Sequence, residues 1–319
     1  MSEIYRAALV GLGQVGLLFD SDPRRSGVWT HFTAYEKLAN YFDLVAACDP
    51  DQSRLEVAKK RRATVRCYDN LDELLSRERL DVVSLCTPPE LHAEQIAQCA
   101  GHVKAILCEK PLSTDSQSAR SALDACRNTE TVLAVNYYKR FDGLVPSVKT
   151  ALDTHELGTV KLVNAIFCGP LEAVGSHMLD LLRFFFGELS LENHVTKVVD
   201  RYSVHLRTET NTLVNLHNVG PREEFVFELD IIGDQGRIRL LNNCDSCEFF
   251  RYCDSDRYSG YRELYPAKLS PYVPAERFLP LFQETAEVLR GKRRALTSDG
   301  ENALRTQFLI DTVAEHLDQ

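Results

Sequence analysis

Residues 7–16 read Ala-Ala-Leu-Val-Gly-Leu-Gly-Gln-Val-Gly, a short apolar run followed by three closely spaced glycines. The apolar run predicts a buried strand, and the pattern Gly11-x-Gly13-x-x-Gly16 directly after it is typical of the turn that carries a dinucleotide pyrophosphate. The first glycine of such a turn allows a tight bend, the second lets the phosphates approach the backbone, and the third lets a helix pack closely on the strand. We therefore expect the residues of this turn to bind a dinucleotide, namely Gly11, Gly13, Gln14, Val15 and Gly16.

An acidic residue at the end of the next apolar run completes this pattern. Asp49 follows the run Leu44–Cys48, where a carboxylate accepts hydrogen bonds from the adenosine ribose and repels a 2′-phosphate, so it favours NAD over NADP. The distance from Gly16 to Asp49 exceeds the roughly 20 residues usual for the motif. A polar insertion at Asp20–Gly27 accounts for the excess, and His31 beyond it is a candidate to cover the cofactor cleft.

The first 137 residues alternate between strand-like and helix-like patterns. The strand candidates are Ala7–Val10, Leu44–Cys48, Thr64–Cys67, Val82–Cys86, Ala105–Cys108 and Val132–Val135. The helix candidates are Thr33–Leu38, Gln52–Arg61, Leu71–Ser76, Ala93–Cys99 and Ala119–Cys126, with Asp51 and Asn70 as capping residues. This alternation predicts an α/β fold, a doubly wound parallel sheet of the Rossmann type with helices on both faces.

Longer extended runs follow residue 158 and indicate a second, α+β domain with a mostly antiparallel open sheet. These runs are Thr159–Cys168, Val195–Val199, Ser203–Leu206, Leu213–Val219, Phe225–Ile232 and Arg237–Leu240. Helical patterns at Glu276–Arg290 and Glu301–Leu317 close the chain. We expect domains at residues 1–137 and 138–319, with the terminal helices able to pack back on the first domain.

A polar tripeptide, Glu109-Lys110-Pro111, stands at the exit of the apolar run Ala105–Cys108. Open α/β sheets bind their ligands outside the carboxyl ends of the strands. A carboxylate and an amine at this position therefore predict a ligand site in the same domain as the glycine turn.

Composition narrows the functional classes. The formal charge of −9 argues against general affinity for nucleic acid or an anionic membrane, and no apolar run reaches the 18 residues that a membrane span needs. The first residues lack a secretory pattern, so we expect a cytoplasmic protein. Most of the ten cysteines lie in apolar runs and predict buried thiols. Cys244, Cys247 and Cys253 lack a second paired set, so we expect no metal site.

The chain resembles the Gfo/Idh/MocA family, named for glucose–fructose oxidoreductase, inositol dehydrogenase and a rhizopine-catabolism protein. The stretches that carry this resemblance are Gly11–Gly16, Cys86-Thr-Pro-Pro-Glu-Leu-His92, Glu109–Pro111, Asn136-Tyr-Tyr-Lys-Arg-Phe141, Gly175-Ser-His-Met-Leu-Asp180 and Ile231–Arg237. The resemblance implies NAD(P)-dependent hydride transfer at a hydroxyl-bearing carbon of a sugar, inositol or nucleotide-linked sugar. It also implies a homodimer or homotetramer formed through the open sheet.

The same resemblance places Thr87, Pro88 and His92 near the cofactor, and Glu109 near both the nicotinamide and the substrate. Lys110 can donate hydrogen bonds to the reacting oxygen or move its proton, and His177 is the second acid/base candidate. Three residues after His177, Asp180 lies on the same helix face and can orient it or bind substrate. Arg140 suits either a substrate anion or a structural ion pair.

One position departs from the family pattern. Many members carry an aspartate four residues before the histidine, where this chain has Ala173 with Glu172 beside it. Three readings remain: Lys110 and His177 suffice, Glu172 substitutes through a shifted backbone, or the activity is altered or lost. The alternatives to a dehydrogenase are therefore a cofactor-binding regulatory protein and an enzyme that uses bound NAD without net redox change.

Overall fold

The computed structural model describes residues 3–25, 27–269 and 277–317. The chain forms two compact units. Unit 1 comprises residues 1–141 and 276–307, and unit 2 comprises residues 142–275 and 308–319. Residues 276–307 follow the second sheet in sequence but belong to unit 1.

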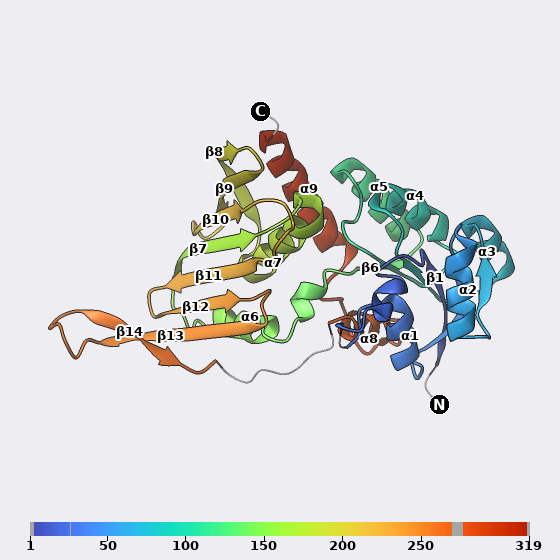
Figure 1. Ribbon diagram of the computed structural model, residues 1–319, viewed down its shortest axis with the longest axis horizontal. Coiled ribbons are helices and arrows are strands. Elements are labelled where there is room, and N and C mark those ends of the chain that lie inside the picture. The colour runs from blue at the N-terminus through green and yellow to red at the C-terminus, as the bar shows by residue number, and fades with distance from the viewer. Residues whose placement is uncertain (1–2, 26, 270–276, 318–319) are drawn as a thin grey trace. The chain divides into compact units, whose positions relative to one another are not determined.

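Unit 1 contains a six-stranded sheet in which every strand pairing is parallel. Its strands are β1 (Tyr5–Val10), β2 (Phe42–Cys48), β3 (Arg66–Tyr68), β4 (Val82–Leu85), β5 (Ala105–Cys108) and β6 (Val132–Val135). The order β3-β2-β1-β4-β5-β6 reverses direction between β1 and β4, so the sheet is doubly wound (Figure 1). The predicted Rossmann sheet is confirmed.

Helices connect these strands and cover both faces of the sheet. They are η1 (Leu18–Ser21), α1 (His31–Lys37), α2 (Gln52–Arg61), α3 (Leu71–Arg77), α4 (Pro89–Cys99), α5 (Ser116–Asn128), η2 (Tyr138–Phe141), α8 (Leu279–Leu289) and the first part of α9 (Gly300–Leu317). Asp51 and Asn70 cap α2 and α3 as expected, because each side chain accepts a hydrogen bond from a backbone amide of the first turn.

Alternate residues of each strand face opposite layers of the core. Ala7 and Leu9 pack with α1, α2 and α8, whereas Ala8 and Val10 pack with α3, α4, α5 and the start of α9. Figure 1 shows α4 and α5 side by side. The segment before α9 lies along the outer edge of β6, where the Ser298 hydroxyl donates to the Val135 carbonyl at 2.7 Å. Both faces of this sheet are therefore buried, which leaves the strand ends as its open part.

Unit 2 contains an eight-stranded sheet in the order β14-β13-β12-β11-β7-β10-β9-β8. Its strands are β7 (Val160–Phe167), β8 (Leu189–Val198), β9 (Arg201–Thr208), β10 (Leu213–Asn218), β11 (Phe227–Gly233), β12 (Gly236–Leu241), β13 (Ser246–Asp254) and β14 (Arg262–Ala267). Among the described pairings of this second sheet, only β7–β10 is parallel, so the mostly antiparallel sheet is confirmed.

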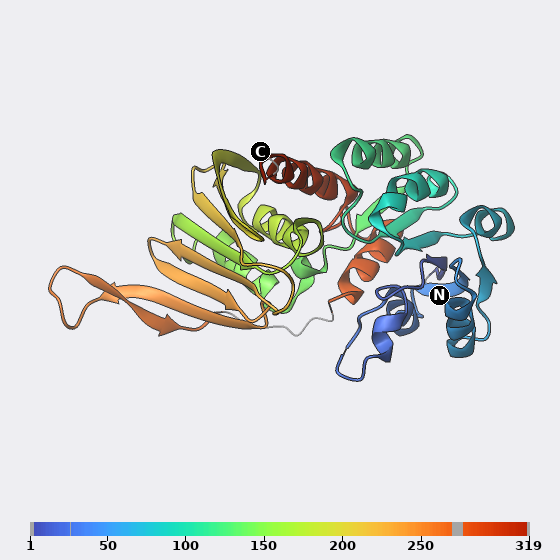
Figure 2. The ribbon, with the colours of Figure 1, turned by 45° about the horizontal axis from the view of Figure 1, so that its top comes forward.

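One face of this sheet is covered by α6 (Val145–Asp153), α7 (Ser176–Phe186) and the end of α9. The other face carries polar cross-strand pairs, such as Arg237–Asp230 and His205–Asn215. Figure 2 shows β13 and β14 as a hairpin that extends beyond the remaining strands of the sheet. No helix in the described ranges is both long and apolar enough to cross a membrane.

Three elements of unit 2 were not predicted: β13, β14 and α6. Phe249 is the one deeply buried side chain of β13, so its sequence lacks the apolar alternation that indicates a strand. Helix α6 carries a proline near its start, a position that a helix tolerates but that reads as a break in sequence. The predicted helix at 276–290 is α8, and Glu276 itself lies outside the described residues.

Candidate functional site

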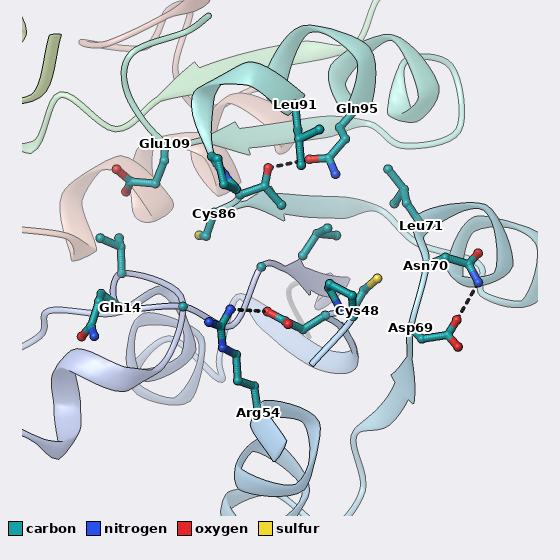
Figure 3. A pocket seen from close by; sticks show the side chains of 18 of the residues that line it. Gln14, Cys48, Arg54, Asp69, Asn70, Leu71, Cys86, Leu91, Gln95 and Glu109 are labelled. Atoms are coloured by element: carbon teal, nitrogen blue, oxygen red, sulfur yellow. Dashed lines mark hydrogen bonds and ion pairs between the residues drawn. The ribbon is translucent and has the colours of Figure 1, made fainter. Parts of the chain in front are cut away.

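A cavity of about 720 Å³ lies at the carboxyl ends of β1, β2, β4 and β5, all within unit 1 (Figure 3). This is where the strand order of a doubly wound sheet reverses and where such sheets bind ligands. Its lining comes mainly from five turns: the glycine turn after β1 and the turns after β2, β3, β4 and β5. Glu109 lies toward one end of the cavity, and Asp69 and Asn70 lie toward the other.

The three glycines of the turn have different surroundings. Gly11 has φ +86°, and a Cβ there would lie 2.6 Å from the Cys86 carbonyl carbon. A Cβ on Gly16 would lie 2.0 Å from the Gly11 carbonyl oxygen. Gly13 lines the cavity, and a Cβ there would meet nothing closer than Arg54, at 4.0 Å. Gly11 and Gly16 are therefore required by the fold, whereas at Gly13 the cavity side of the turn is open.

The predicted insertion separates the glycine turn from α1. After the turn the chain forms η1 and a loop before α1 begins at His31. Two backbone hydrogen bonds rejoin the parts: His31 N–H donates to the Val15 carbonyl at 3.0 Å and Phe32 N–H to the Gly16 carbonyl at 3.1 Å. Asp20 of the insertion accepts from Thr30, the N-cap of α1, and from Arg61 of α2. The start of α1 is thus tied to the glycine turn despite the intervening residues.

Asp49 is buried beside the glycine turn. Its carboxylate accepts from the Leu12 amide at 2.7 Å and the Asp51 amide at 2.9 Å, and the Arg54 guanidinium lies 3.4 Å away. Figure 3 marks this ion pair, with Arg54 rising into the cavity from α2. The half-exposed Arg54 puts a positive charge beside the predicted ribose-binding acid.

Glu109 is the second carboxylate of the site that several groups contact. Its Oε1 accepts from His31 Nε2 at 3.0 Å and from the Asn136 side-chain amide at 2.6 Å, and the Lys110 amide lies 3.4 Å from Oε2. Burial acts to raise the pKa of this carboxyl, but the hydrogen bonds and charges of His31, Asn136 and Lys110 hold that pKa below its usual range. An ionised carboxylate is therefore held at the cavity wall.

Lys110 lines the cavity next to Glu109, and a cis peptide bond joins it to Pro111. Thr87 and Pro88 line the cavity from the turn after β4, where the Thr87 hydroxyl donates to the Gln95 side chain at 2.6 Å. The structure thus brings most of the predicted cofactor residues, together with Glu109 and Lys110, to one cavity.

Two of the predicted cofactor residues do not line the cavity. Gly16 lies behind the turn, against Gly11. His92 is fully buried, with Nδ1 2.9 Å from the Pro111 carbonyl and Nε2 2.8 Å from the Thr87 carbonyl. Burial lowers the pKa of His92, although both carbonyl contacts act against that shift. The imidazole joins the turn after β4 to the turn after β5 and so supports two walls of the cavity.

The remaining predicted residues lie elsewhere in the chain. Arg140 is buried in unit 1, where its guanidinium donates to the Thr297 carbonyl at 2.7 Å. His177 and Asp180 are buried in α7 of unit 2.

A π-helical turn, Leu171–Gly175, precedes α7. Such a turn holds one more residue than an α-helical turn, so the residue one turn before His177 is the fifth preceding residue, Glu172. Glu172 is exposed. Burial of Tyr202 raises the pKa of its hydroxyl, and the charge of Glu172 raises it further. The backbone before α7 therefore departs from a regular α-helix at Glu172.

Sequence reasoning missed the partners that hold the site together. Asn136 follows the apolar strand β6 directly and so carries the same signal that identified Glu109. Asp69 and Asn70 follow β3, whose sequence Arg-Cys-Tyr is not an apolar run. Arg54 stands one helical turn after the cap of α2. Among the described residues, no three histidine, cysteine or acidic side chains gather as a metal site, and the ten cysteines form no disulfide there.

Comparison with known proteins identifies the domain that holds the cavity. Residues 5–137 match the Gfo/Idh/MocA profile, described as the oxidoreductase family with an NAD-binding Rossmann fold. This chain carries the NAD-binding domain of the Gfo/Idh/MocA family. The family predicted from the sequence motifs is thereby confirmed for residues 5–137. An inositol 2-dehydrogenase of Rhizobium meliloti is 30% identical over 160 residues, covering 46% of this chain and 48% of that protein. The matches to the first curated relatives span about half of the length of those proteins.

Solved structures extend the similarity in fold to both units. The WlbA dehydrogenase of Bordetella pertussis, in complex with NADH and UDP-GlcNAcA, is 17% identical with a TM-score of 0.79, covering 99% of this chain and 96% of that one. A 3-ketoreductase of Actinomadura kijaniata, in complex with NADP and TDP-benzene, is 19% identical with a TM-score of 0.77, covering 98% of each chain. At these identities the likeness concerns the fold alone.

Proposed function

We propose that this protein is an NAD(P)-dependent oxidoreductase that transfers hydride between nicotinamide and a hydroxyl-bearing carbon of a sugar, polyol or sugar derivative. One observation carries the proposal: the glycine turn and the Glu109–Lys110 turn line the same cavity. Cofactor and proton-managing groups must meet at one place for such a reaction. The relatives add support, since those with a named activity include an inositol dehydrogenase.

The residues of the cavity fit a dinucleotide. The open face of Gly13 leaves room for a pyrophosphate against the backbone, and Asp49 would accept from a ribose hydroxyl. When bound, the nicotinamide supplies or takes up the hydride. Lys110 would donate a hydrogen bond to the reacting oxygen and stabilise its developing negative charge, while Glu109 fixes the position of that turn. We propose His177 as the acid/base group of unit 2, with Asp180 to orient it.

A hydride-exchange assay tests this proposal. Purified protein is mixed either with deuterated NADH and a panel of keto sugars, or with NAD⁺ and a panel of polyols, sugars and nucleotide-linked sugars. Deuterium transfer to carbon is measured in the first case and hydride transfer to NAD⁺, as NADH formed, in the second. We expect transfer with at least one member of the panel. Tight NADH binding without any transfer would favour the regulatory protein, and product formation without net cofactor reduction would favour a non-redox reaction.

We propose NAD as the preferred cofactor, because Asp49 stands where a 2′-phosphate would lie. Asp49→Asn keeps the shape of the side chain and one acceptor for the Leu12 amide but removes the charge, which leaves Arg54 to face a phosphate. We expect the ratio of the NADPH to the NADH dissociation constant to fall about tenfold or more, equivalent to about 1.4 kcal/mol. Titration of intrinsic fluorescence measures both constants. If the ratio is unchanged, or if adding Arg54→Ala does not reverse the gain, this assignment is wrong.

We also propose that Glu172 assists His177 through the π-helical turn. Glu172→Gln removes the charge without changing the length of the side chain, so we expect kcat to fall about tenfold to a hundredfold, less than for His177→Asn. Steady-state kinetics with the substrate that the hydride-exchange assay identifies measures kcat. Glu209→Gln, at an exposed turn of the same unit, is the control. If Glu172→Gln and Glu209→Gln have the same kcat, Glu172 does not assist His177.

A homo-oligomer formed through the open face of the unit 2 sheet is our proposal for the assembly. The face is half-buried and polar, and the β13–β14 hairpin presents the exposed side chains of Tyr258 and Tyr261. Light scattering should give a mass of two or four chains. We propose a cytoplasmic location because the ten cysteines form no disulfide in the described residues, as is usual for proteins of a reducing compartment.

A further inference from the structure

His31 contacts the two halves of the cavity wall through different atoms. Its backbone N–H donates to the Val15 carbonyl in the glycine turn, and its side chain reaches Glu109 in the turn after β5. The residue is fully buried, and the rings of Phe278 and Phe282 pack edge-to-face with its imidazole. His31 therefore links the phosphate end of the predicted cofactor site to the carboxylate beside Lys110.

The direction of the side-chain hydrogen bond follows from chemistry. An ionised carboxylate can only accept, so the proton of the 3.0 Å contact belongs to His31 Nε2. Nδ1 is buried and has no hydrogen-bond partner in the described part of the chain. The ring thus contributes one directed hydrogen-bond donor to the carboxylate.

This donor acts on one oxygen of Glu109. His31 and Asn136 both donate to Oε1, which leaves Oε2 as the oxygen beside the Lys110 amide. Two donors on one oxygen fix the rotation of the carboxylate. Four other titratable groups act on Glu109 or are affected by it. They are Lys110 in the turn after β5, Cys86 in the turn after β4, His92 in α4 and Cys108 in β5.

We propose that His31 is a positioning residue that holds the Glu109 carboxylate ionised and oriented at the cavity wall, and that the glycine turn in turn holds His31. The catalytic consequence rests on the proposed function, because it assumes that Glu109 and Lys110 serve hydride transfer. The interaction between His31 and Glu109 does not depend on that assumption, so it can be tested without a substrate.

A matched pair of variants separates the donor from the ring. Gln and Met at position 31 remove the ring equally, but only the amide of Gln can place a donor where Nε2 lies. We expect His31→Gln to melt about 3–10 °C above His31→Met in the full chain at neutral pH, since a charged hydrogen bond is kept. In a Glu109→Leu background the acceptor is absent, so the buried donor of Gln is unsatisfied and the order should reverse. The same difference in both backgrounds would overturn the proposal.

A pH profile tests the catalytic consequence. Loss of the His31 donor raises the pKa of the buried Glu109 carboxyl, so the ionised form is lost at a higher pH. We expect the acid limb of kcat/KM for His31→Met to move up by about one unit or more, and His31→Gln to restore part of the shift. Tyr35→Phe is the control, because it removes a neutral buried hydrogen bond to Ser84 from the same helix. If the acid limb of kcat/KM moves equally in Tyr35→Phe, or does not move in His31→Met, then His31 contributes only to packing. Absence of any turnover in the wild type would contradict the proposed function and leave the melting result valid.

Discussion

Lys110→Met is expected to lower kcat about 10²–10⁴-fold while the dissociation constant for NADH changes only a few-fold. A positioned proton donor contributes about this much to a transition state, because the charge that it stabilises develops during the reaction. Methionine keeps the length and apolar stem of the side chain and does not alter the backbone before Pro111. Single-turnover measurements with saturating NADH separate the chemical step from binding.

Lys104, just before the start of β5, offers a matched control. Lys104 precedes β5 and Lys110 follows it, so the two lysines stand at opposite ends of four buried residues. The Lys104 ammonium lies 3.0 Å from Asp81 and 3.1 Å from Glu3, away from the cavity lining. Lys104→Met should keep kcat and shift only the melting temperature. If Lys110→Met keeps the wild-type kcat, Lys110 takes no part in the chemical step. If its affinity for NADH falls as much as its kcat, Lys110 binds the cofactor instead.

The parts of the site that could be predicted share one physical property. Gly11, Asp49 and Glu109 each follow a short apolar run directly, and the carboxyl ends of neighbouring parallel strands meet at one edge of the sheet. Local sequence therefore predicts that they come together, although it contains no distances. The same reasoning gave the order of layers in unit 1, because strand–helix alternation leaves few right-handed topologies.

The contacts that could not be predicted are those between distant segments. His31 reaches Glu109 across 78 positions in the sequence, and Asn136 reaches it across 27. A pattern of apolar residues reports which face of an element is buried but not which partner covers it. The pairing of residues 298–299 with β6 is of the same kind, since nothing in the Ser298 region reads as a strand.

Gly13→Ala is expected to weaken NADH binding about tenfold to a hundredfold, or about 1.4–2.8 kcal/mol, with little change in melting temperature. A methyl group at this position meets no atom of the folded chain within about van der Waals distance, since Arg54 is 4.0 Å away. It does occupy the side of the turn that lines the cavity, where a pyrophosphate must approach the backbone. Fluorescence titration and a melting curve on the same sample measure both effects.

The neighbouring glycine makes the opposite prediction and so controls for the added methyl group. In Gly16→Ala the new Cβ would lie 2.0 Å from the Gly11 carbonyl oxygen, a backbone atom that cannot move without opening the turn. This variant should lose several kcal/mol of folding stability or fail to fold. If Gly13→Ala bound NADH as tightly as the wild type, the pyrophosphate would not lie on this turn, and the cavity would require another ligand. If Gly13→Ala stays stable but loses NADH binding, and Gly16→Ala loses stability, then Gly13 serves the ligand and Gly16 serves the fold.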